Sequence, residues 1–419
     1  MRVLVLGSGG REHALVRSLA RDSTVTQLHA APGNPGIGEL ADVHDVTATD
    51  LADVTALARK LAPDLVVIGP EAPLVAGVAD ALADAGFACF GPTQRAAMIE
   101  GSKSFAKQVM TAAGVPTAAA VTCRTESEAV AALARFGSPY VVKADGLAAG
   151  KGVVVTTDRT EALRHARISG TVVIEEYLDG PEVSVFALAD GTRAVALLPA
   201  QDYKRANDGN VGPNTGGMGA YTPLPWAPAD LADETLTTVV APTLAELRRI
   251  GAPYRGLLYA GLCLTARGLR VVEFNARFGD PETQVMLDRL GIPLGGLLAA
   301  CAHGDLTGGE LSWLPGAAVT VVIAAEGYPA SPVRGAEITG LAEAARVPGC
   351  YVLHAGTGYD SSGHLTATGG RVLNIVGTGD DLAAARAGAY QAAAHVRMRG
   401  GWYRGDIAAE PASGISNRT

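Results

Sequence analysis

The residues with the clearest potential for chemistry lie in residues 271–284, Val-Val-Glu-Phe-Asn-Ala-Arg-Phe-Gly-Asp-Pro-Glu-Thr-Gln. The segment begins with strand character, and a strand points alternate side chains to opposite faces. We therefore expect Glu273, Asn275 and Arg277 to share one face. The opposite face would be formed by Val272, Phe274 and Ala276. An acid and a carboxamide offer two oxygen ligands to a hard cation, and a guanidinium can bind a carboxylate or phosphate. A solvated strand face is the simpler alternative, which the constrained polar turn at 278–282 disfavours.

A glycine-rich loop between two apolar strands is the second chemical signal, in residues 140–155. Three glycines would let backbone N–H groups approach phosphate oxygens, and two lysines would neutralise phosphate charge. These residues are Gly146, Gly150, Gly152, Lys143 and Lys151. The loop is not that of P-loop enzymes, because neither Ser nor Thr follows Lys151. A flexible hairpin is an alternative, but together with the Glu-Asn-Arg strand the loop indicates a magnesium–nucleotide site built on sheets.

The amino terminus offers a candidate anion site. An apolar strand, residues 2–6, is followed by the glycine turn at 7–10 and a helical pattern from Ala14. A dinucleotide fingerprint would need glycine at position 12, and Glu12 therefore counts against a nicotinamide cofactor. The turn could cradle a sugar phosphate at a helix amino terminus. A tight turn that only opens a doubly wound sheet explains these residues equally well.

Composition and charge narrow the class of protein. The chain has 419 residues, 48% of them hydrophobic, which suggests two to four domains. A net charge of −8 disfavours nucleic acid as a partner. The five cysteines form no Cys-x-x-Cys pair and are expected to be reduced thiols. With neither a leader pattern nor an apolar run of 18 residues, we expect a cytoplasmic protein without membrane contact.

The order of predicted elements divides the chain into three parts. Strands alternate with helices up to about residue 100, which is typical of a parallel sheet with ligands at the carboxyl ends of its strands. We expect an amino-terminal α/β domain at 1–101 and a central domain at 102–325, with a lid subdomain at about 117–186. A carboxyl-terminal domain would occupy 326–419, with its last dozen residues disordered.

The motifs taken together resemble the ATP-grasp ligases, and more closely the glycinamide ribonucleotide synthetase family of phosphoribosylamine–glycine ligases. The resemblance spans nearly the whole chain and rests on motifs in residues 7–14, 31–34, 69–74, 100–103, 143–152, 213–221, 273–284, 354–357 and 369–373. It implies an α/β fold: an amino-terminal parallel doubly wound sheet, ATP-grasp central domains with antiparallel sheets, and a small carboxyl-terminal α+β domain. It also implies that ATP, glycine and 5-phosphoribosylamine give glycinamide ribonucleotide, ADP and phosphate in purine synthesis.

The resemblance also implies residue roles. ATP binding falls to Lys103, Lys143, Gly146, Gly150, Lys151, Gly152, Glu175, Glu176, Tyr177, Leu178 and Glu182. Substrate binding falls to Gly9, Gly10, Gly69, Pro70, Glu71, Pro73, Gly216, Gly217, Met218, Gly219, Arg277 and Asp280. Mg²⁺ or Mn²⁺ would be held by Glu273 and Asn275. Catalytic roles fall to Arg277, Lys143 and Asp202. The chain is expected to act as a monomer on these small molecules.

The chain departs from the family pattern in four places. Ala276 replaces a frequent cysteine, and Tyr203 replaces a frequent histidine, which weakens an acid–base role for position 203. Only residues 168–171 remain of a usually longer stretch, so the closure of the lid is in question. The predicted strand at 257–265 offers no acid opposite Glu273, so the metal would rest on two protein ligands.

Three alternatives remain open from the sequence. Another ATP-grasp carboxylate–amine ligase or carboxylase would use a different acid. A non-catalytic nucleotide-binding module would bind ATP without turnover, which the complete set of lysines and metal-type ligands disfavours. A nicotinamide dehydrogenase is disfavoured by Glu12.

Overall fold

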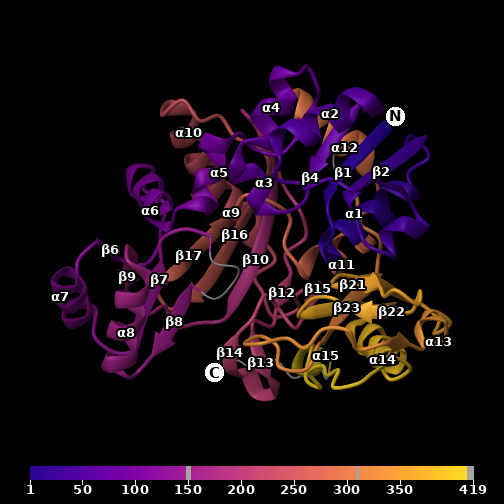
Figure 1. Ribbon diagram of the computed structural model, residues 1–419. Coiled ribbons are helices and arrows are strands. Elements are labelled where there is room, and N and C mark those ends of the chain that lie inside the picture. Colours follow the sequence, from indigo (N-terminus) through magenta and orange to yellow (C-terminus); the bar gives the residue numbers. More distant parts are fainter. Residues whose placement is uncertain (148–151, 308–310, 413–419) are drawn as a thin grey trace.

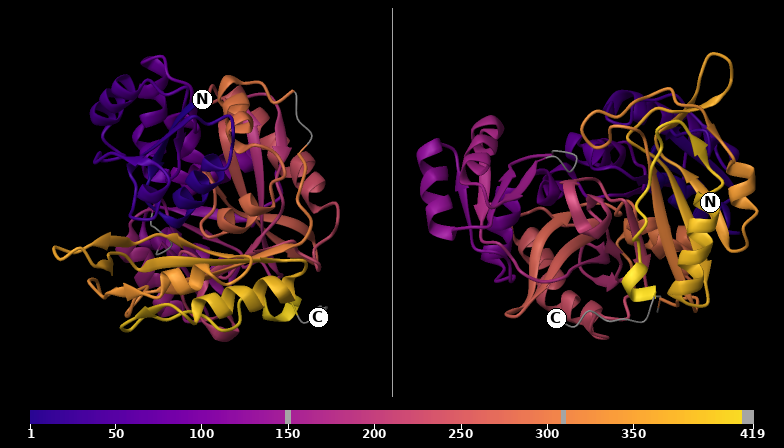
Figure 2. Two further views of the ribbon diagram at one scale, coloured as in Figure 1. Left: turned by 90° about the vertical axis from the view of Figure 1, so that its right-hand side faces the viewer. Right: turned by 90° about the horizontal axis from the view of Figure 1, so that it is seen from below.

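The computed structural model describes residues 1–147, 152–307 and 311–412, and four large sheets organise them (Figure 1). In that view the amino-terminal domain lies at the upper right, the lid at the left and the carboxyl-terminal domain at the lower right. Viewed from below, the central sheet lies between the lid and the carboxyl-terminal domain (Figure 2). The expected α/β class is confirmed. None of the described helices is both long and apolar enough to cross a membrane.

The amino-terminal sheet is parallel, as the sequence predicts, with strand order β3-β2-β1-β4-β5. Its strands are β1 (Arg2–Gly7), β2 (Gln27–Pro32), β3 (Asp42–Val43), β4 (Leu65–Ile68) and β5 (Cys89–Phe90). Its helices are α1 (Gly10–Ala20), α2 (Leu51–Leu61), α3 (Glu71–Ala76) and α4 (Val78–Asp84). Residues Val3 to Leu6 are fully buried, and such continuous apolar strands are typical of a sheet covered on both faces.

The turn between β1 and α1 is filled by the side chain of Glu12. Helix α1 begins at Gly10, four residues before the expected Ala14, so Glu12 belongs to its first turn. The Glu12 carboxylate accepts a hydrogen bond from the Gly9 N–H at 2.6 Å. A Cβ atom at Gly7 or Gly69 would collide with the Glu12 side chain. The acid that breaks the dinucleotide fingerprint thus occupies the space that the neighbouring glycines leave free.

Two helices connect this domain to the lid. They are α5 (Gln94–Gly101) and α6 (Lys103–Ala112). The lid sheet has the order β6-β9-β7-β8 and is antiparallel. Its elements are β6 (Ala120–Cys123), α7 (Glu126–Phe136), β7 (Tyr140–Ala144), β8 (Val153–Thr156), α8 (Arg159–Ser169) and β9 (Val172–Glu175). Because the next strand joins another sheet, the lid sheet ends at Glu175, before the expected boundary at 186. The shortened segment at 168–171 is a direct connection from α8 to β9 through Gly170, which has φ of +73°.

The central sheet is antiparallel, with the order β11-β10-β16-β17. Its strands are β10 (Glu182–Asp190), β11 (Ala194–Ala196), β16 (Arg255–Thr265) and β17 (Gly268–Asn275). The helices that follow β15 (Gly219–Thr222) and β17 are α9 (Leu231–Thr235), a π-helical turn (Leu236–Val240), α10 (Ala241–Arg249), α11 (Glu282–Met286) and α12 (Leu294–His303).

A β-bulge in β17 changes the expected alternation. Gly261 pairs with Glu273 but Leu262 pairs with Val271, which leaves Val272 as an extra residue. Val271 and Phe274 are therefore both buried in the core, whereas the sequence pattern placed Val272 on the face of Phe274. Glu273 and Asn275 lie beyond the bulge and keep their expected common side.

The carboxyl-terminal sheet draws strands from two distant parts of the chain, in the order β12-β15-β18-β23-β20. Its strands are β12 (Gln201–Asp202), β15 (Gly219–Thr222), β18 (Ala317–Ala324), β20 (Cys350–His354) and β23 (Arg371–Gly379). β18 pairs with β23, so the expected boundary at 325 separates two neighbouring strands. Around the sheet lie the helices α13 (Leu341–Ala345) and α14 (Leu382–Ala393). Three two-stranded sheets lie there too: β13 (Arg205–Asn207) with β14 (Val211–Asn214), β19 (Ile338–Thr339) with β24 (Arg397–Met398), and β21 (Thr357–Tyr359) with β22 (Leu365–Ala367).

Part of the tail that was expected to be disordered is ordered. Ile407 and Ala408 are fully buried against the carboxyl-terminal sheet, and α15 (Ala409–Ala412) follows them. Burial of two apolar side chains overrides the small, polar composition of the segment.

The packing of Glu12 predicts a specific compensation. Gly69→Ala should lower the free energy of unfolding by about 1–3 kcal/mol, because the new methyl group overlaps the Glu12 carboxylate. Adding Glu12→Ala should make the cost of Gly69→Ala much smaller, since the overlap is gone. Denaturant unfolding of the single and double variants measures this coupling. Gly296→Ala, where a Cβ atom meets open space, is the matched control; additive effects of the two substitutions would contradict the packing argument.

Candidate active site

Lys143 connects the lid to the central sheet. It lies on β7, forms an ion pair with Glu175 on β9, and donates a hydrogen bond to the Val272 carbonyl oxygen at 2.9 Å. Burial alone would raise the pKa of Glu175, but Lys143 and Lys107 together hold that pKa below its ordinary value. The lysine predicted to bind ATP phosphates therefore lies where the lid meets β17.

The start of the glycine loop is fixed to the amino-terminal end of α6. Lys103 donates to the Gly146 carbonyl oxygen at 3.0 Å. Asp145 accepts from the Ser104 hydroxyl at 2.5 Å and from the Ser102 hydroxyl at 3.0 Å. Gly152, at the other end of the loop, accepts from the Ala144 N–H at 2.7 Å. The predicted ligands Gly150 and Lys151 lie outside the described residues.

Glu273 and Asn275 supply the oxygen ligands predicted for a metal. Glu273 lies opposite Gly261, where a Cβ atom would come within 3.2 Å of the Glu273 side chain, so the glycine leaves room for the acid. Within the described ranges, no group of three or more His, Cys, Asp or Glu side chains is arranged to hold a metal ion. Two hard oxygen donors fit Mg²⁺ or Mn²⁺ that is also bound by substrate phosphates, as Mg²⁺ commonly is.

Arg277 is held by acids from two other segments. Its Nε donates to Glu71 at 3.2 Å, and its Nη2 lies 3.0 Å from Glu100 and 3.4 Å from the Asn275 Oδ1. Its Nη1 donates to the Phe278 carbonyl oxygen at 3.2 Å. Of the five guanidinium N–H groups, these contacts leave one on Nη1. The sequence predicts that this fork binds a carboxylate or phosphate; in the structure most of its N–H groups contact groups of the protein.

The pKa values of the two acids around Arg277 are shifted in opposite directions. Burial would raise the pKa of Glu71, but Arg277 and Arg11 lower that pKa to about 2. Burial raises the pKa of Glu100 above its ordinary value despite the neighbouring Arg277. Glu100 was not among the predicted site residues, because its position before Ser102-Lys103 was its only signal in the sequence.

Asp280 is fixed by Arg371 of the carboxyl-terminal domain. The Arg371 Nη2 lies 2.9 Å from the Asp280 carboxylate, and its Nη1 donates to the Asp280 carbonyl oxygen at 2.7 Å. The same Nη1 also donates to the carbonyl oxygens of Gly216 and Gly217. Arg371 therefore brings two predicted substrate loops together. Sequence reasoning noted Arg371 only as part of a motif.

Asp202 lies in a cluster of charged side chains on the edge of β10 and β12. Burial, with Glu282, Glu182 and Glu273 as like charges, raises the pKa of Asp202 to about 7, although Lys204 opposes the change. Lys204 forms an ion pair with Glu182 at 2.8 Å. The neighbouring Tyr203 hydroxyl accepts from the Ala408 N–H at 2.9 Å. This hydrogen bond to the tail gives Tyr203 a structural role. Such a role agrees with the weaker case for acid–base chemistry at a position where tyrosine replaces a frequent histidine.

Further predicted residues belong to the connection after β9, for ATP, and to the loop before β15, for the second substrate. Glu176 lies 3.0 Å from Arg267 and accepts from the Ala119 N–H at 3.2 Å, and Tyr177 is exposed. Met218 is fully buried, and a Cβ atom at Gly219 would collide with the Thr320 carbonyl oxygen. Met218 and Gly219, from the predicted substrate loop at 216–219, thus pack within the carboxyl-terminal sheet.

The amino-terminal glycines have a packing reason of their own. The Gly9 N–H is bound by Glu12, and a Cβ atom at Gly10 would collide with the Asn374 side chain of the carboxyl-terminal domain. A side chain at Gly10 would disturb this domain contact whether or not phosphate binds nearby. A phosphate-binding role for Gly9 and Gly10, with Pro70 and Pro73 beside them, stays a prediction.

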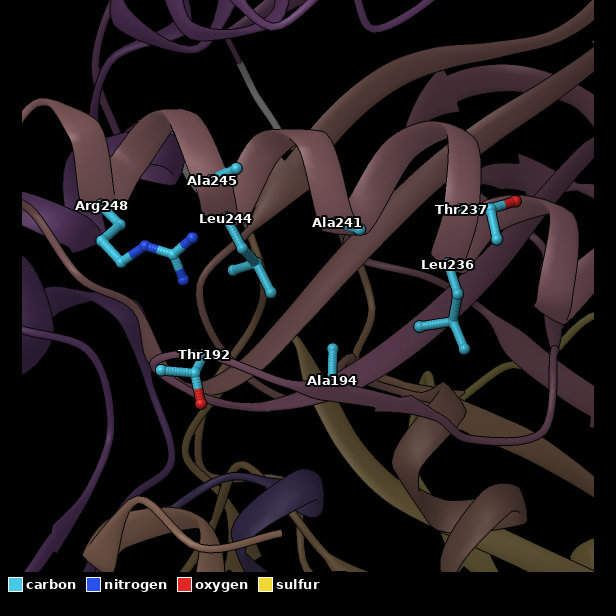
Figure 3. A pocket seen from close by; sticks show the side chains of 8 residues that line it. All are labelled: Thr192, Ala194, Leu236, Thr237, Ala241, Leu244, Ala245 and Arg248. Carbon is cyan, nitrogen blue, oxygen red and sulfur yellow. The ribbon is translucent and has the colours of Figure 1, made fainter. Parts of the chain in front are cut away.

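One surface pocket lies apart from these residues, between β11 and the π-helical turn with α10 (Figure 3). It has a volume of about 220 Å³ and is lined by Thr192, Ala194, Leu236, Thr237, Ala241, Leu244, Ala245 and Arg248. None of the predicted site residues is among them. The candidate active site is therefore the region where the lid, the central sheet and the domains at either end meet.

The comparisons with known proteins cover nearly the whole chain. Residues 1–100, 101–283 and 318–410 match the N domain, the ATP-grasp (A) domain and the C domain of phosphoribosylglycinamide synthetase. Phosphoribosylamine–glycine ligase of Streptomyces coelicolor is 59% identical over 415 residues, 98% of this chain and 100% of the relative. The protein of that name from Mycobacterium leprae is 53% identical over 429 residues, 99% of both chains. The crystal structure of phosphoribosylamine–glycine ligase from Thermotoga maritima superposes with a TM-score of 0.83 at 34% identity and covers 97% of this chain and 100% of that one.

The raised pKa of Asp202 predicts a pH-dependent cost in stability. Between pH 4 and 7 the unfolded chain releases this proton while the folded chain keeps it, so the stability contributed by this group falls as pH rises. Asp202→Asn removes the effect. The variant should gain stability over the wild type from pH 4 to 7, by up to roughly 4 kcal/mol from 1.36 kcal/mol per pKa unit. Denaturant unfolding at pH 5 and pH 8 measures the gain, and an equal difference at both values would contradict the raised pKa.

Proposed function

This chain belongs to the phosphoribosylglycinamide synthetase family, and from that membership we propose how its residues perform the reaction. The protein is a phosphoribosylamine–glycine ligase of purine biosynthesis. It joins glycine to 5-phosphoribosylamine and converts ATP to ADP and phosphate. The observation that supports this most strongly is the match of all three family domains, in order, together with Lys143, Glu273 and Asn275 at one junction.

The reaction follows from the weakness of a carboxylate as an electrophile. A glycine carboxylate oxygen attacks the γ-phosphorus of ATP, which gives glycyl phosphate and releases ADP. The amine of phosphoribosylamine then attacks the acyl carbon, phosphate leaves, and the nitrogen loses a proton. Neither step needs a protein nucleophile, so the protein contributes positioning and charge stabilisation.

Lys103 and Lys143 are the proposed ligands of the ATP phosphates. Lys103 on α6 contacts the start of the glycine loop, and Lys143 on the lid strand β7 contacts the edge of β17. The residues Glu175 to Leu178 would bind the adenine through backbone groups, because they form the connection from the lid to the central sheet. Glu182 follows at the start of β10, where its carboxylate could accept from ribose hydroxyl groups.

Glu273 and Asn275 are the proposed ligands of Mg²⁺ or Mn²⁺. Their common side of β17 and the space left by Gly261 support the assignment. When bound, the ion neutralises the phosphate oxygens and so stabilises the charge that develops in phosphoryl transfer.

Arg277 and Asp202 have distinct proposed roles. The acids around Arg277 fix its guanidinium next to Asn275, and the remaining N–H can bind one oxygen of glycine or of the transferred phosphoryl group. A pKa of about 7 for Asp202 suits a proton acceptor for the attacking amine near neutral pH. Gly216, Gly217 and Asp280 would surround phosphoribosylamine. All of these residues come from one chain, so we expect a monomer to be active.

The assay that tests this function measures ADP formation with glycine and freshly made phosphoribosylamine. Activity with another acid and amine pair, or with bicarbonate, and none with this pair would favour a different ATP-grasp ligase or carboxylase. Tight ATP binding without turnover would favour a nucleotide-binding module.

Removing either proposed metal ligand should stop turnover. We expect Glu273→Gln and Asn275→Leu to lower the rate of ADP formation by about a hundredfold or more, because the metal contributes several kcal/mol to charge stabilisation. Circular dichroism should show an unchanged fold. Glu234→Gln, an exposed acid on α9, is the control. Wild-type rates in both metal-ligand variants would exclude the assignment.

Arg277→Lys tests whether the planar guanidinium matters beyond its charge. A lysine has three N–H groups on one nitrogen and cannot replace the four contacts that the planar guanidinium makes to Glu71, Glu100, Asn275 and Phe278, so we expect the rate of ADP formation to fall by roughly a hundredfold. ATP affinity should change little. The exposed Arg249, substituted in the same way, should have no effect. A near-normal rate for Arg277→Lys would show that this residue does not stabilise the reaction.

A further inference from the structure

One buried carboxylate is shared by two lysines at the junction of α6, the lid and β17. Glu175 forms ion pairs with Lys143 and with Lys107, the latter at 2.6 Å. The side chains of Glu175, Lys143 and Lys107 are 4%, 6% and 13% exposed. The charges are therefore largely withdrawn from water, and each depends on the others for compensation.

The two lysines differ in the number of their partners in the described part of the chain. Besides its ion pair with Glu175, Lys107 donates hydrogen bonds to the Thr117 hydroxyl at 2.8 Å and to the Ala118 carbonyl oxygen at 3.1 Å. Besides its own ion pair with Glu175, Lys143 donates, among the described residues, only to the Val272 carbonyl oxygen. Because each ammonium group has three N–H donors, Lys143 has more capacity left for an incoming oxygen than Lys107 has.

Lys107 is also fixed where the lid begins. Its partner Thr117 donates its hydroxyl to the Val271 carbonyl oxygen at 2.7 Å, and this carbonyl neighbours the Val272 carbonyl that Lys143 contacts. Lys107 is therefore bound to the base of the lid and cannot turn to a ligand without breaking these contacts.

We propose that Lys107 is a positioning residue for nucleotide binding: it holds the Glu175 carboxylate so that Lys143 can be shared with the phosphates. The inference rests on the proposed role of Lys143 in binding ATP. With both lysines present the cluster has a net charge of +1 and attracts a polyanion. Without Lys107 the net charge is zero, and Lys143 becomes the sole partner of a buried acid.

Because the net charge of the cluster decides its attraction for ATP, we expect a second substitution to restore the ATP affinity that the first one lowers. Lys107→Met should weaken ATP binding roughly tenfold or more. Adding Glu175→Gln returns the cluster to +1 and frees Lys143, so the double variant should bind ATP at least about fivefold more tightly than Lys107→Met alone. Lys107→Arg, which keeps the charge, should stay within about threefold of the wild type.

Titration calorimetry of the full-length variants with ATP and Mg²⁺ measures these affinities, and thermal unfolding reports on the fold. Lys60→Met, an exposed lysine on α2, is the control. If Lys107 only stabilises the fold, Glu175→Gln will not restore affinity, and the inference is wrong. Lys143→Met distinguishes a failure of the proposed ATP site from a failure of the role of Lys107. If Lys143→Met leaves ATP affinity unchanged, the proposed ATP site itself is wrong. If Lys143→Met weakens binding and Lys107→Met does not, the role of Lys107 alone is excluded.

Discussion

The buried guanidinium of Arg277 joins the amino-terminal domain to the central sheet. Its acidic partners Glu71 and Glu100 come from α3 and α5, and Glu71 is 206 positions away along the chain. A buried arginine requires such partners, because an unpaired charge would be strongly destabilising away from water. Since Arg277 lies two residues after the end of β17, this pairing also sets where the chain turns toward Asp280 and α11. The positions of the proposed metal ligands before Arg277 and of the proposed substrate loop after it both depend on the pairing.

Most cations of the candidate site are already paired with acids of the protein. Arg277 is paired with Glu71 and Glu100, Arg371 with Asp280, Lys204 with Glu182 and Lys143 with Glu175. Such pairs fix the side chains before a substrate arrives, which avoids part of the entropic cost of ordering them during the reaction. These pairs also reduce the positive charge that is available to neutralise phosphates. A bound divalent cation would supply the positive charge that is still needed.

The sequence predicts the fold well where a local pattern decides the structure. The apolar strands before the glycine turns and the parallel amino-terminal sheet are found as expected. The failures come from contacts between distant residues. The bulge at Val272 depends on pairing with Gly261. The early start of α1 at Gly10 is a local exception, because the Glu12 carboxylate binds the Gly9 N–H within the same turn.

The same reason explains which parts of the site could be foreseen. Local sequence motifs predict the roles of Glu273, Asn275 and Lys143. The fold brings distant ion-pair partners close to three other residues, and only these partners indicate a role for Glu100, Arg371 and Lys107. A single sequence gives the residue types but not these pairings, so the acids that hold Arg277 could not be identified without the structure.

The mixed origin of the carboxyl-terminal sheet limits how the gene could be cut or recombined. β12 and β15 precede much of the central sheet in the chain but extend the sheet built by β18, β23 and β20. A fragment that begins near residue 326 would lack three of these five strands and leave the inner edge of β23 unpaired. Such an open edge favours aggregation. Exchange of this domain between relatives would therefore need the segments at 201–222 and 317–324 to be transferred with it, and the domain is not a module that evolution or an engineer can move as one continuous piece.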